Sequence, residues 1–572
     1  MNEPIITFKN FSFGYQSQQS NTLHDINLEI YPGEKILILG ASGSGKSTLG
    51  NCINGLIPNQ YKGRITGSCH VSGLDITKSD IFSLSETVGT VLQDSDAQFV
   101  GLNVAEDIAF GLENMNTPRK TMAEFVKKAA HRVGVLDQLD VLPYSLSGGQ
   151  KQRVSVAGIL NDKNEILLLD EPLAALDPQM GQTMIELIDD LNQTDGKTVI
   201  IIEHRFEDVL HRLVDRVVLM DAGKIVTIKT PDELITSNLL IEYGIREPLY
   251  ISALKNMYGG LAQEQNLTRL ETVDLTPYPD RIPIGTFETF DEPNEHLSPA
   301  NKTDSAEIIK IDQLQFGYDQ NDFINIPELS IHEGERIAIM GENGSGKTTL
   351  AKLLTGVIQP QSGSIHRIGN PETIQEIAKS IGYVMQNPNQ MLVTDNVFDE
   401  VAYALELRNY SKEEIEERVF KVLRITGLYG KRNWPISALS YGQKKRLSIA
   451  VVLALEPKCL ILDEPTAGQD YAHYREMMDF VNQLNQEQDI AFIFITHDMH
   501  LALEYTDRAL VIEDGKILAD APTFDVLDND SLVKRASLKK TSIFDFARKM
   551  NHPVDQFLHA FIQRESEVFQ HE

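Results

Sequence analysis

The segment GASGSGKS at residues 40–47 decides the fold of this chain, and GENGSGKT at residues 341–348 repeats it. Both fit the pattern GxxxxGK[ST], and each follows a short apolar run such as EKILILG at 34–40. An apolar run that ends in a glycine loop predicts a strand, then a loop, then a helix. The loop N–H groups and the helix N-terminus of such a unit face phosphate oxygens, so the sequence predicts two phosphate sites.

Further motifs occur twice, in the same order as the glycine loops. LSGGQ at 146–150 recurs as LSYGQ at 439–443, and LLLDEP at 167–172 recurs as LILDEP at 460–465. Three pairs of residues share an offset of 293 positions (440 − 147): Ser147 and Ser440, Asp170 and Asp463, and His204 and His497. A constant offset across separate motifs indicates a tandem duplication of one domain.

The glycine loops supply the predicted ATP contacts. Lys46 and Lys347 are expected to reach the β- and γ-phosphates, while the Ser47 and Thr348 hydroxyls face Mg²⁺. The predicted nucleotide-binding positions are Gly40, Ser42, Gly43, Ser44, Gly45, Lys46, Ser47 and Thr48 in the first copy, and Gly341, Asn343, Gly344, Ser345, Gly346, Lys347, Thr348 and Thr349 in the second. A glycine-rich turn without a ligand is the alternative, and two matches that head the same motif series argue against it.

Paired carboxylates follow two of the apolar runs. Asp170–Glu171 and Asp463–Glu464 are expected at strand ends, on the carboxyl edge of the sheet where open α/β folds bind ligands. We expect Asp170 and Asp463 to orient Mg²⁺, and Glu171 and Glu464 to act as general bases on the attacking water. A helix cap or a solvated turn is the alternative for an isolated pair, and the position behind a P-loop favours catalysis.

A histidine and a glutamine complete each predicted site. His204 and His497 lie 33 residues after their glutamates (204 − 171), end the next apolar run, and are expected to contact the γ-phosphate. Gln93 and Gln386 follow VGTVL and IGYVM, also 293 residues apart (386 − 93), and are expected to bridge the metal, water and a neighbouring surface. One such residue at a strand end is usually only a polar terminus, so the paired placement carries the prediction.

Alternating strand and helix patterns predict an α/β protein with two domains, at about 4–235 and 307–527. Residues 236–306 match neither copy. Their first part is apolar enough to pack as helix, and the stretch from about 271 is rich in proline and acidic residues, as in linkers. The tail, 528–572, contains SIFDFARKM and VDQFLHAFIQR at helical spacing, which predicts a small helical appendage or docking element.

Composition narrows the function classes. The formal net charge of −30 argues against broad electrostatic binding to nucleic acid or anionic lipid. Three scattered cysteines support neither a disulfide framework nor a zinc site. The start, MNEPIITFKN, lacks the apolar core of a secretory signal, and no run of 18 apolar residues occurs. We therefore expect a cytosolic protein that acts at a membrane only through partners.

The ordered set of P-loop, glutamine loop, LSGGQ, Asp-Glu strand end and histidine resembles the ATP-binding subunits of ABC transporters, with two nucleotide-binding domains fused. The resemblance implies P-loop NTPase domains with a mainly parallel core sheet, an antiparallel β subdomain and a helical subdomain. It also implies a head-to-tail pairing of the two domains. In that pairing ATP held by one copy is completed by the opposite LSGGQ-type motif: Ser440, Gly442 and Gln443 for the first P-loop, and Ser147, Gly149 and Gln150 for the second.

The resemblance extends to flanking residues. Tyr15 and Tyr318 are implied to stack on adenine, with a core aromatic of an edge strand as the alternative. Asp177 and Asp470 are implied to lie at the interface of the two domains. The second copy departs from the usual pattern at AGQD and LSYGQ, but every phosphate-contacting residue type is intact, so we expect both sites to be active and leave open whether their rates are equal.

The segments VAEDIAFGLENM at 104–115 and VFDEVAYALELR at 397–408, together with EHRFEDV and LSYGQKKR, resemble the energy-coupling factor importers of vitamins and transition-metal ions. The resemblance implies a membrane coupling subunit and a substrate-binding membrane subunit as partners, and a peripheral location at the cytoplasmic face of the membrane. Basic residues of the coupling subunit are expected to meet acidic residues near the glutamine loops: Asp94, Glu106, Asp107, Asp395, Asp399 and Glu400. A solvated helix face is the alternative for each of them.

Two rival functions remain. A soluble twin-ATPase that acts on ribosomes or nucleic acid would usually carry a long charged linker, a cysteine-rich cluster or a zinc module. Here the linker is proline-rich and acidic, the cysteines are scattered and the net charge is strongly negative, which argues against that class. A twin-ATPase of a sugar importer commonly has one degenerate site, whereas both carboxylate–histidine sets are complete here. The favoured prediction is an ATP-hydrolysing transport motor whose cargo is chosen by a partner.

Overall fold

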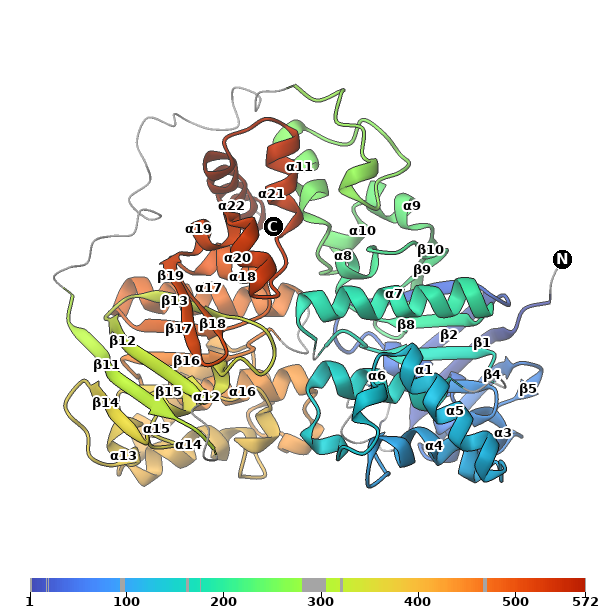
Figure 1. Ribbon diagram of the computed structural model, residues 1–572, viewed down its shortest axis with the longest axis horizontal. Coiled ribbons are helices and arrows are strands. Elements are labelled where there is room, and N and C mark those ends of the chain that lie inside the picture. The colour runs from blue at the N-terminus through green and yellow to red at the C-terminus, as the bar shows by residue number, and fades with distance from the viewer. Residues whose placement is uncertain are drawn as a thin grey trace. The chain divides into compact units, whose positions relative to one another are not determined.

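The computed structural model describes residues 3–16, 18, 20–92, 98–160, 164–174, 176–279, 305–318, 323–466 and 471–570. The chain divides into two compact units, Met1–Pro279 and Asp280–Glu572. Each unit contains one copy of the repeated motifs and is described by itself (Figure 1).

The first unit is built on a six-stranded, mainly parallel sheet with the order β10-β9-β3-β8-β7-β6. Its strands are β3 Lys35–Leu39, β6 Val88–Val91, β7 Ile166–Asp170, β8 Thr198–Ile202, β9 Arg216–Asp221 and β10 Lys224–Lys229. Every residue of β3 and β8 is buried, as expected for apolar strands covered on both faces. Only the edge strand β10 pairs antiparallel, with β9.

A four-stranded antiparallel sheet packs against this core. It has the order β2-β1-β4-β5, with β1 Ile6–Tyr15, β2 Leu23–Ile30, β4 Gly63–Val71 and β5 Leu74–Asp75. Phe8, Phe11 and Phe13 alternate with more polar residues along β1, and all three are buried in one cluster with residues of the core sheet. The two sheets therefore share a hydrophobic core that positions the loop after β3.

The helices of the first unit are α1 Lys46–Ile53, α2 Leu56–Asn59, α3 Ile81–Ser85, α4 Val104–Asn114, α5 Arg119–Arg132, α6 Gly148–Ile159, α7 Pro178–Asp195, α8 Phe206–Val209, α9 Pro231–Thr236, α10 Leu239–Glu242 and α11 Leu249–Tyr258. Helices α4, α5 and α6 pack on one another and form the helical subdomain. Helix α7 runs beside β8 (Figure 1). The predicted fold class, including the parallel core, the antiparallel sheet and the helical subdomain, is confirmed.

The second unit repeats this plan, with a core sheet of order β15-β16-β17-β13-β18-β19 and a smaller sheet of order β12-β11-β14. Its strands are β11 Glu307–Phe316, β12 Ile324–His332, β13 Arg336–Met340, β14 Ser362–Arg367, β15 Ile381–Val384, β16 Cys459–Asp463, β17 Ala491–Ile495, β18 Arg508–Glu513 and β19 Lys516–Pro522. Its helices are α12 Lys347–Leu354, α13 Ile374–Ile377, α14 Val397–Leu407, α15 Lys412–Ile425, α16 Tyr441–Leu453, α17 Tyr471–Gln488, α18 Met499–Tyr505, α19 Thr523–Asp528, α20 Asp530–Arg535, α21 Ser542–Lys549 and α22 Val554–Gln570.

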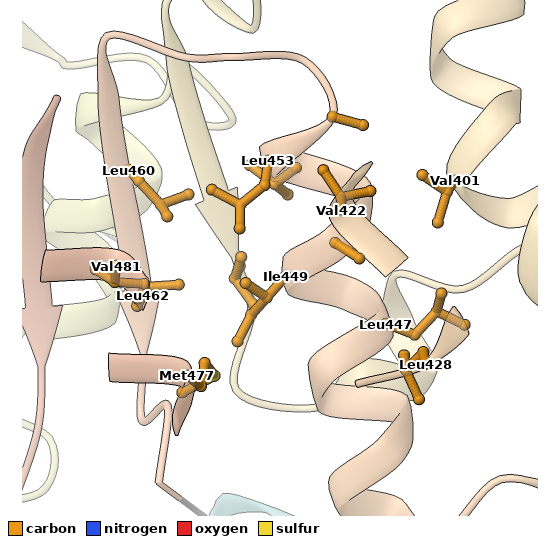
Figure 2. Packing of buried hydrophobic residues seen from close by; sticks show 14 of the residues in the cluster. Val401, Val422, Leu428, Leu447, Ile449, Leu453, Leu460, Leu462, Met477 and Val481 are labelled. Atoms are coloured by element: carbon orange, nitrogen blue, oxygen red, sulfur yellow. The ribbon is translucent and has the colours of Figure 1, made fainter. Parts of the chain in front are cut away.

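One hydrophobic cluster joins the helical subdomain of the second unit to its core sheet. Figure 2 shows Ile449 and Leu453 of α16 close to Leu460 and Leu462 of β16. Val401 and Leu447 extend the same cluster toward α14. Because α16 begins at the LSYGQ motif and β16 ends at Asp463, one hydrophobic cluster connects a motif predicted to complete the first ATP site with the aspartate of the second.

Each unit ends in a helical appendage, and the two appendages meet equivalent helices. The amide of Leu249, at the start of α11, donates to Glu207 Oε2 on α8 at 3.2 Å. In the second unit, His500 Nε2 on α18 lies 3.3 Å from Glu565 Oε2 on α22. Glu207 and His500 occupy equivalent positions (500 − 207 = 293). The segment after the first copy and the C-terminal tail thus both contact the helix that follows the predicted histidine.

Candidate functional site

The two P-loops have the same local geometry. In the first copy the loop lies between β3 and α1, and Gly45, just before the helix, has a φ of 101°. Its equivalent Gly346, before α12, has a φ of 110°. Residues with a side chain avoid this region of φ, so the glycines permit the turn that delivers the lysine.

The two lysines lie buried over their loops. Lys46 Nζ donates to the carbonyl oxygens of Gly40 at 2.7 Å and Ala41 at 3.0 Å. Lys347 Nζ donates to Gly341 at 2.9 Å and Glu342 at 2.8 Å. The ammonium groups therefore lie at the mouth of each loop beside the start of the following helix, where an anion is favoured.

Buried hydroxyls test whether these loops fit a phosphate group. Ser44 Oγ and Ser345 Oγ are enclosed by their loops and have no hydrogen-bond partner among the residues that the structure describes. Buried polar atoms are usually hydrogen-bonded. A phosphate oxygen in the loop would satisfy these donors, so the residues present fit a nucleotide.

A hydroxyl and an aspartate meet in each copy, as the sequence predicts for a magnesium site. Ser47 Oγ donates to Asp170 Oδ1 at 3.4 Å, and Thr348 Oγ1 donates to Asp463 Oδ2 at 3.0 Å. Hydroxyl, carboxylate and phosphate oxygens are the donors that Mg²⁺ prefers. In the second copy Tyr383 also donates to Asp463 Oδ2 at 3.0 Å, a contact that sequence reasoning missed.

Burial shifts the proton affinity of these aspartates. Desolvation, assisted by the neighbouring charge of Glu171, raises the pKa of Asp170 to about 6. Desolvation also raises the pKa of Asp463, although Thr348 and Tyr383 oppose the shift by hydrogen bonding. A bound cation would stabilise the ionised form of both carboxylates.

The predicted bases and histidines come together in both units. Glu171 and Glu464 have left-handed φ angles of 48° and 47°. Their amides donate to the carbonyl oxygens of Ile202 and Ile495 in the adjacent strands. A positive φ is strained for a side chain of this size, so its recurrence indicates a conformation imposed by the fold.

The distance between base and histidine differs between the copies. His204 Nδ1 lies 4.0 Å from Glu171 Oε1, whereas His497 Nε2 lies 3.4 Å from Glu464 Oε1. Burial raises the pKa of Glu464, opposed by the charge of Lys347. A carboxylate with raised proton affinity is suited to accept a proton from water.

The LSGGQ-type motifs start helices α6 and α16. Ser147 and Ser440 cap these helices, and Gln150 and Gln443 bond back to the capping residue in a capping box. A Cβ atom at Gly149 would lie 2.1 Å from Met180 Sδ, so a side chain there would displace Met180. These contacts lie within each unit, and the pairing of the motifs with the opposite P-loop stays a prediction.

The remaining predicted residues flank the P-loops. The Tyr15 hydroxyl lies 3.2 Å from Thr48 Oγ1, and the Tyr318 hydroxyl lies 3.3 Å from Thr349 Oγ1. Each tyrosine is thus held beside the helix that follows the loop.

The structure describes one of the two predicted glutamines and one of the two predicted interface aspartates. Gln386 follows β15 and is exposed. Asp177 caps α7 and is buried. Gln93 and Asp470 lie outside the described residues.

The acidic residues near the glutamine loops mostly serve the loops themselves. Asp107 Oδ1 accepts hydrogen bonds from the amides of Val100 and Gly101, at 2.8 and 3.0 Å. Glu400 is buried and accepts from the amide of Thr394 at 2.6 Å. Asp395 and Asp399 are exposed, while Asp94 lies outside the described residues. The carboxylates of Asp107 and Glu400 therefore stabilise their loops by accepting hydrogen bonds from loop amides. Neither of these contacts was predicted from the sequence.

Among the residues that the structure describes, no helix has the length and apolar character needed to cross a bilayer. The same residues hold no group of three histidine, cysteine, aspartate or glutamate side chains arranged to bind a metal ion. A magnesium site of the type described above needs only one carboxylate and one hydroxyl from the protein, with phosphate oxygens and water as the other ligands.

Comparison with known proteins identifies the family. A sequence profile described as ABC transporter matches residues 23–174 and 324–467. A second profile, described as ATP-binding cassette cobalt transporter, matches residues 237–316.

Several relatives match along almost their whole length. A protein from Lactiplantibacillus plantarum is 50% identical over 99% of this chain and 100% of its own. Another, from Vibrio vulnificus, is 48% identical over 98% of this chain and 97% of its own. The names of both assign them to the ABC transporter ATP-binding proteins.

A solved structure of cbiO1 from Clostridium perfringens, described as part of the ABC transporter complex cbiONQ, is 32% identical. It covers 41% of this chain and 97% of its own, with a TM-score of 0.37. The profile and the relatives determine the assignment: this chain belongs to the ABC transporter ATP-binding proteins, and it is an ATPase with two such domains in one polypeptide.

Proposed function

We propose that the chain is the motor subunit of an energy-coupling factor-like importer, which takes up a vitamin or a transition-metal ion through membrane partner subunits. The observation that carries this proposal is the complete set of lysine, hydroxyl, aspartate, glutamate and histidine in each unit. Two complete sites suit a motor that binds two ATP molecules per cycle. The match of residues 237–316 to a cobalt-transporter profile supports the importer class.

The residues divide the chemistry between them. Lys46 and Lys347 bind the β- and γ-phosphates by charge-assisted hydrogen bonds. Asp170 with Ser47, and Asp463 with Thr348, would hold Mg²⁺, which would neutralise charge on the phosphates when bound.

The glutamates act as the bases of the reaction. Glu171 or Glu464 accepts a proton from water while the water oxygen bonds to the γ-phosphorus and the bond to the β–γ bridging oxygen breaks. His204 and His497, beside these glutamates, contact the γ-phosphate. The products are ADP and inorganic phosphate.

Closure of the two domains drives transport in this proposal. ATP on the first P-loop is completed by Ser440, Gly442 and Gln443, and ATP on the second by Ser147, Gly149 and Gln150. The starts of α16 and α6 support this role, because each presents a helix N-terminus, whose dipole favours an anion such as the γ-phosphate. ATP binding then draws the domains together, and hydrolysis releases them.

Exposed apolar side chains that follow each glutamine loop support docking of a membrane subunit. Val100 and Leu102 follow the first loop and are 62% and 76% exposed. Val393 follows the second loop at the position equivalent to Val100 (393 − 100 = 293), and it is 69% exposed. Exposed apolar side chains grouped on one surface commonly mark a protein interface. The proposed occupant is a cytoplasmic helix of the coupling subunit, and the proposed location of the chain is therefore the cytoplasmic face of the membrane.

The alternative of a ribosome- or nucleic-acid-acting ATPase is not favoured. The net charge of −30 opposes binding to phosphate backbones. The relatives that match nearly the full length are named as transporter components.

Affinity purification of the tagged chain from gently solubilised cells tests the proposal. We expect integral membrane proteins to co-purify, and vesicles reconstituted with them to take up Co²⁺ or a vitamin when ATP is supplied. The variant Lys46→Ala with Lys347→Ala should keep the partners and lose uptake. Recovery of ribosomal proteins in place of membrane proteins would contradict the proposal.

A further inference from the structure

Two ionic side chains of opposite charge are fully buried beside the two Asp-Glu pairs, one in each copy. Glu203 in the first copy corresponds to Thr496 in the second (496 − 203 = 293). Lys445 in the second copy corresponds to Gln152 in the first (445 − 152 = 293). Glu203 and Lys445 are both 0% exposed. Charged side chains are rarely buried to this extent unless they are paired or hydrogen-bonded, so each requires a structural role.

Glu203 joins two loops of the first site. Its Oε1 accepts a hydrogen bond from the amide of Leu173 at 3.1 Å. Its Oε2 accepts from the amides of His204 at 3.0 Å and Arg205 at 3.3 Å. Leu173 lies two residues after Glu171 in the same turn. One buried carboxylate thus connects the turn of the proposed base to the loop of the histidine.

A second contact strengthens the same connection. The guanidinium of Arg205 donates through Nη2 to the carbonyl oxygen of Leu173. Leu173 in the turn therefore both donates a hydrogen bond to Glu203 and accepts one from Arg205 of the histidine loop. Thr496, in place of Glu203, accepts from the amide of Asp498 at 2.9 Å, a contact inside its own loop.

Lys445 joins a different pair of segments in the second site. Its Nζ donates to the carbonyl oxygens of Met385 at 2.8 Å and Gln386 at 3.0 Å, and of Asp463 at 2.8 Å. An ammonium group has three donors, and these three bonds use all of them. The buried cation thus connects the glutamine loop to the strand end that carries the proposed metal-binding aspartate.

We propose that Glu203 and Lys445 are positioning residues of the two hydrolytic sites, and that they couple each Asp-Glu pair to a different neighbouring loop. The inference rests on the proposed function, which assigns Glu171 and Asp463 their roles. In the first site the base moves together with the loop of His204. In the second site the aspartate moves together with the loop of Gln386, so movement of that loop is transmitted to the strand end that carries Asp463.

Exchange substitutions between the copies test this inference in the full chain. Glu203→Thr and Lys445→Gln each introduce the residue that the same fold already carries at the equivalent position. Amide hydrogen exchange should accelerate in residues 171–173 and 204–206 of the Glu203→Thr variant, and stay unchanged in 464–466 and 497–499. In Lys445→Gln it should accelerate in 385–387 and 463–465, and stay unchanged in 170–172.

Kinetics supply the second measurement. We expect each variant to lose about 10-fold or more in kcat, because small misplacements of catalytic groups are costly. The dissociation constant of a fluorescent ATP analogue should stay within about 2-fold, because the P-loop contacts are untouched. Glu203→Gln keeps the size of the side chain and one acceptor oxygen, so its kcat should lie between those of wild type and Glu203→Thr.

Three results would overturn the inference. The first is that either variant accelerates amide hydrogen exchange equally in both copies. The second is that both hydrogen exchange and kcat stay at wild-type values. The third is that nucleotide affinity, kcat and Tm all fall together. Failure of the proposed function would look different. The variant Glu171→Gln with Glu464→Gln would then turn over ATP at the wild-type rate, while the exchange pattern would still report on the two loop connections.

Discussion

The imidazole Nε2 of His497 lies 3.4 Å from the carboxylate Oε1 of Glu464. The equivalent pair in the first copy, His204 and Glu171, is separated by 4.0 Å and approaches through Nδ1. The two sites therefore carry the same groups in different relative orientations. Equal rates of ATP hydrolysis at the two sites do not follow from their shared residues.

Removal of the proposed bases should separate binding from hydrolysis. In the variant Glu171→Gln with Glu464→Gln, kcat should fall by about 100-fold or more, since a general base contributes at least this factor. Affinity for ATP should change little, because neither glutamate binds the phosphates directly in the proposed site. Steady-state phosphate release and equilibrium nucleotide binding measure the two effects. A kcat within a few-fold of wild type would exclude both glutamates as bases.

Removal of the P-loop lysines should weaken binding itself. Lys46→Ala with Lys347→Ala should lower ATP affinity by about 10- to 100-fold, the range for losing a hydrogen bond to a charged group. Turnover should be abolished. The control is Lys224→Ala with Lys516→Ala, which changes two exposed lysines at the starts of β10 and β19. Equal behaviour of the two double variants would refute the assignment of the loops.

Acid should weaken metal-dependent nucleotide binding at the first site. The pKa of Asp170, about 6 in the folded chain, lies above its value of about 3.9 in an unfolded chain. Because burial favours the neutral acid, the contribution of Asp170 to stability is present below about pH 4 and is lost as pH rises through 6. Only the ionised carboxylate binds Mg²⁺ well, so binding of ATP with Mg²⁺ should weaken between pH 7.5 and 5.5 and be accompanied by proton release. Calorimetry in buffers of different ionisation enthalpy measures this release, and Asp170→Asn should reduce it.

The paired tyrosines should contribute to adenine binding through their rings. Tyr15→Ala with Tyr318→Ala should lower ATP affinity by about 2- to 10-fold, the range for an aromatic stacking contact. Phenylalanine at both positions keeps the ring and removes the hydroxyl contacts to Thr48 and Thr349, and it should leave affinity nearly unchanged. Equal losses in the alanine and phenylalanine variants would assign the effect to the hydroxyls instead.

The sequence predicted the architecture because its signals are local. Each P-loop is a continuous segment whose glycines, lysine and hydroxyl lie within eight residues, so the sequence pattern alone predicts the local geometry. The strand before it is apolar on both faces, which already indicates a central place in a parallel sheet. The confirmed fold class follows from these features repeated twice.

The roles of the two buried charged side chains, Glu203 and Lys445, could not be predicted from a local sequence motif. Glu203 matters because its carboxylate reaches the amide of Leu173, 30 residues earlier in the chain. Lys445 matters because it meets Met385, 60 residues earlier, and Asp463, 18 residues later. A charged residue within a helix or at a strand end is usually exposed, and only the packed structure reveals that both side chains are enclosed.

The appendages set the size of the smallest fragment that can fold by itself. Phe544, Phe546, Phe557 and Phe561 of α21 and α22 are fully buried, and His500 meets Glu565 in the same region. A chain cut after Asp528, where α19 ends, would lose these helices and uncover His500 on α18, three residues after His497 of the second site. An autonomous second half must therefore extend through α22, well past the last residue needed for ATP chemistry.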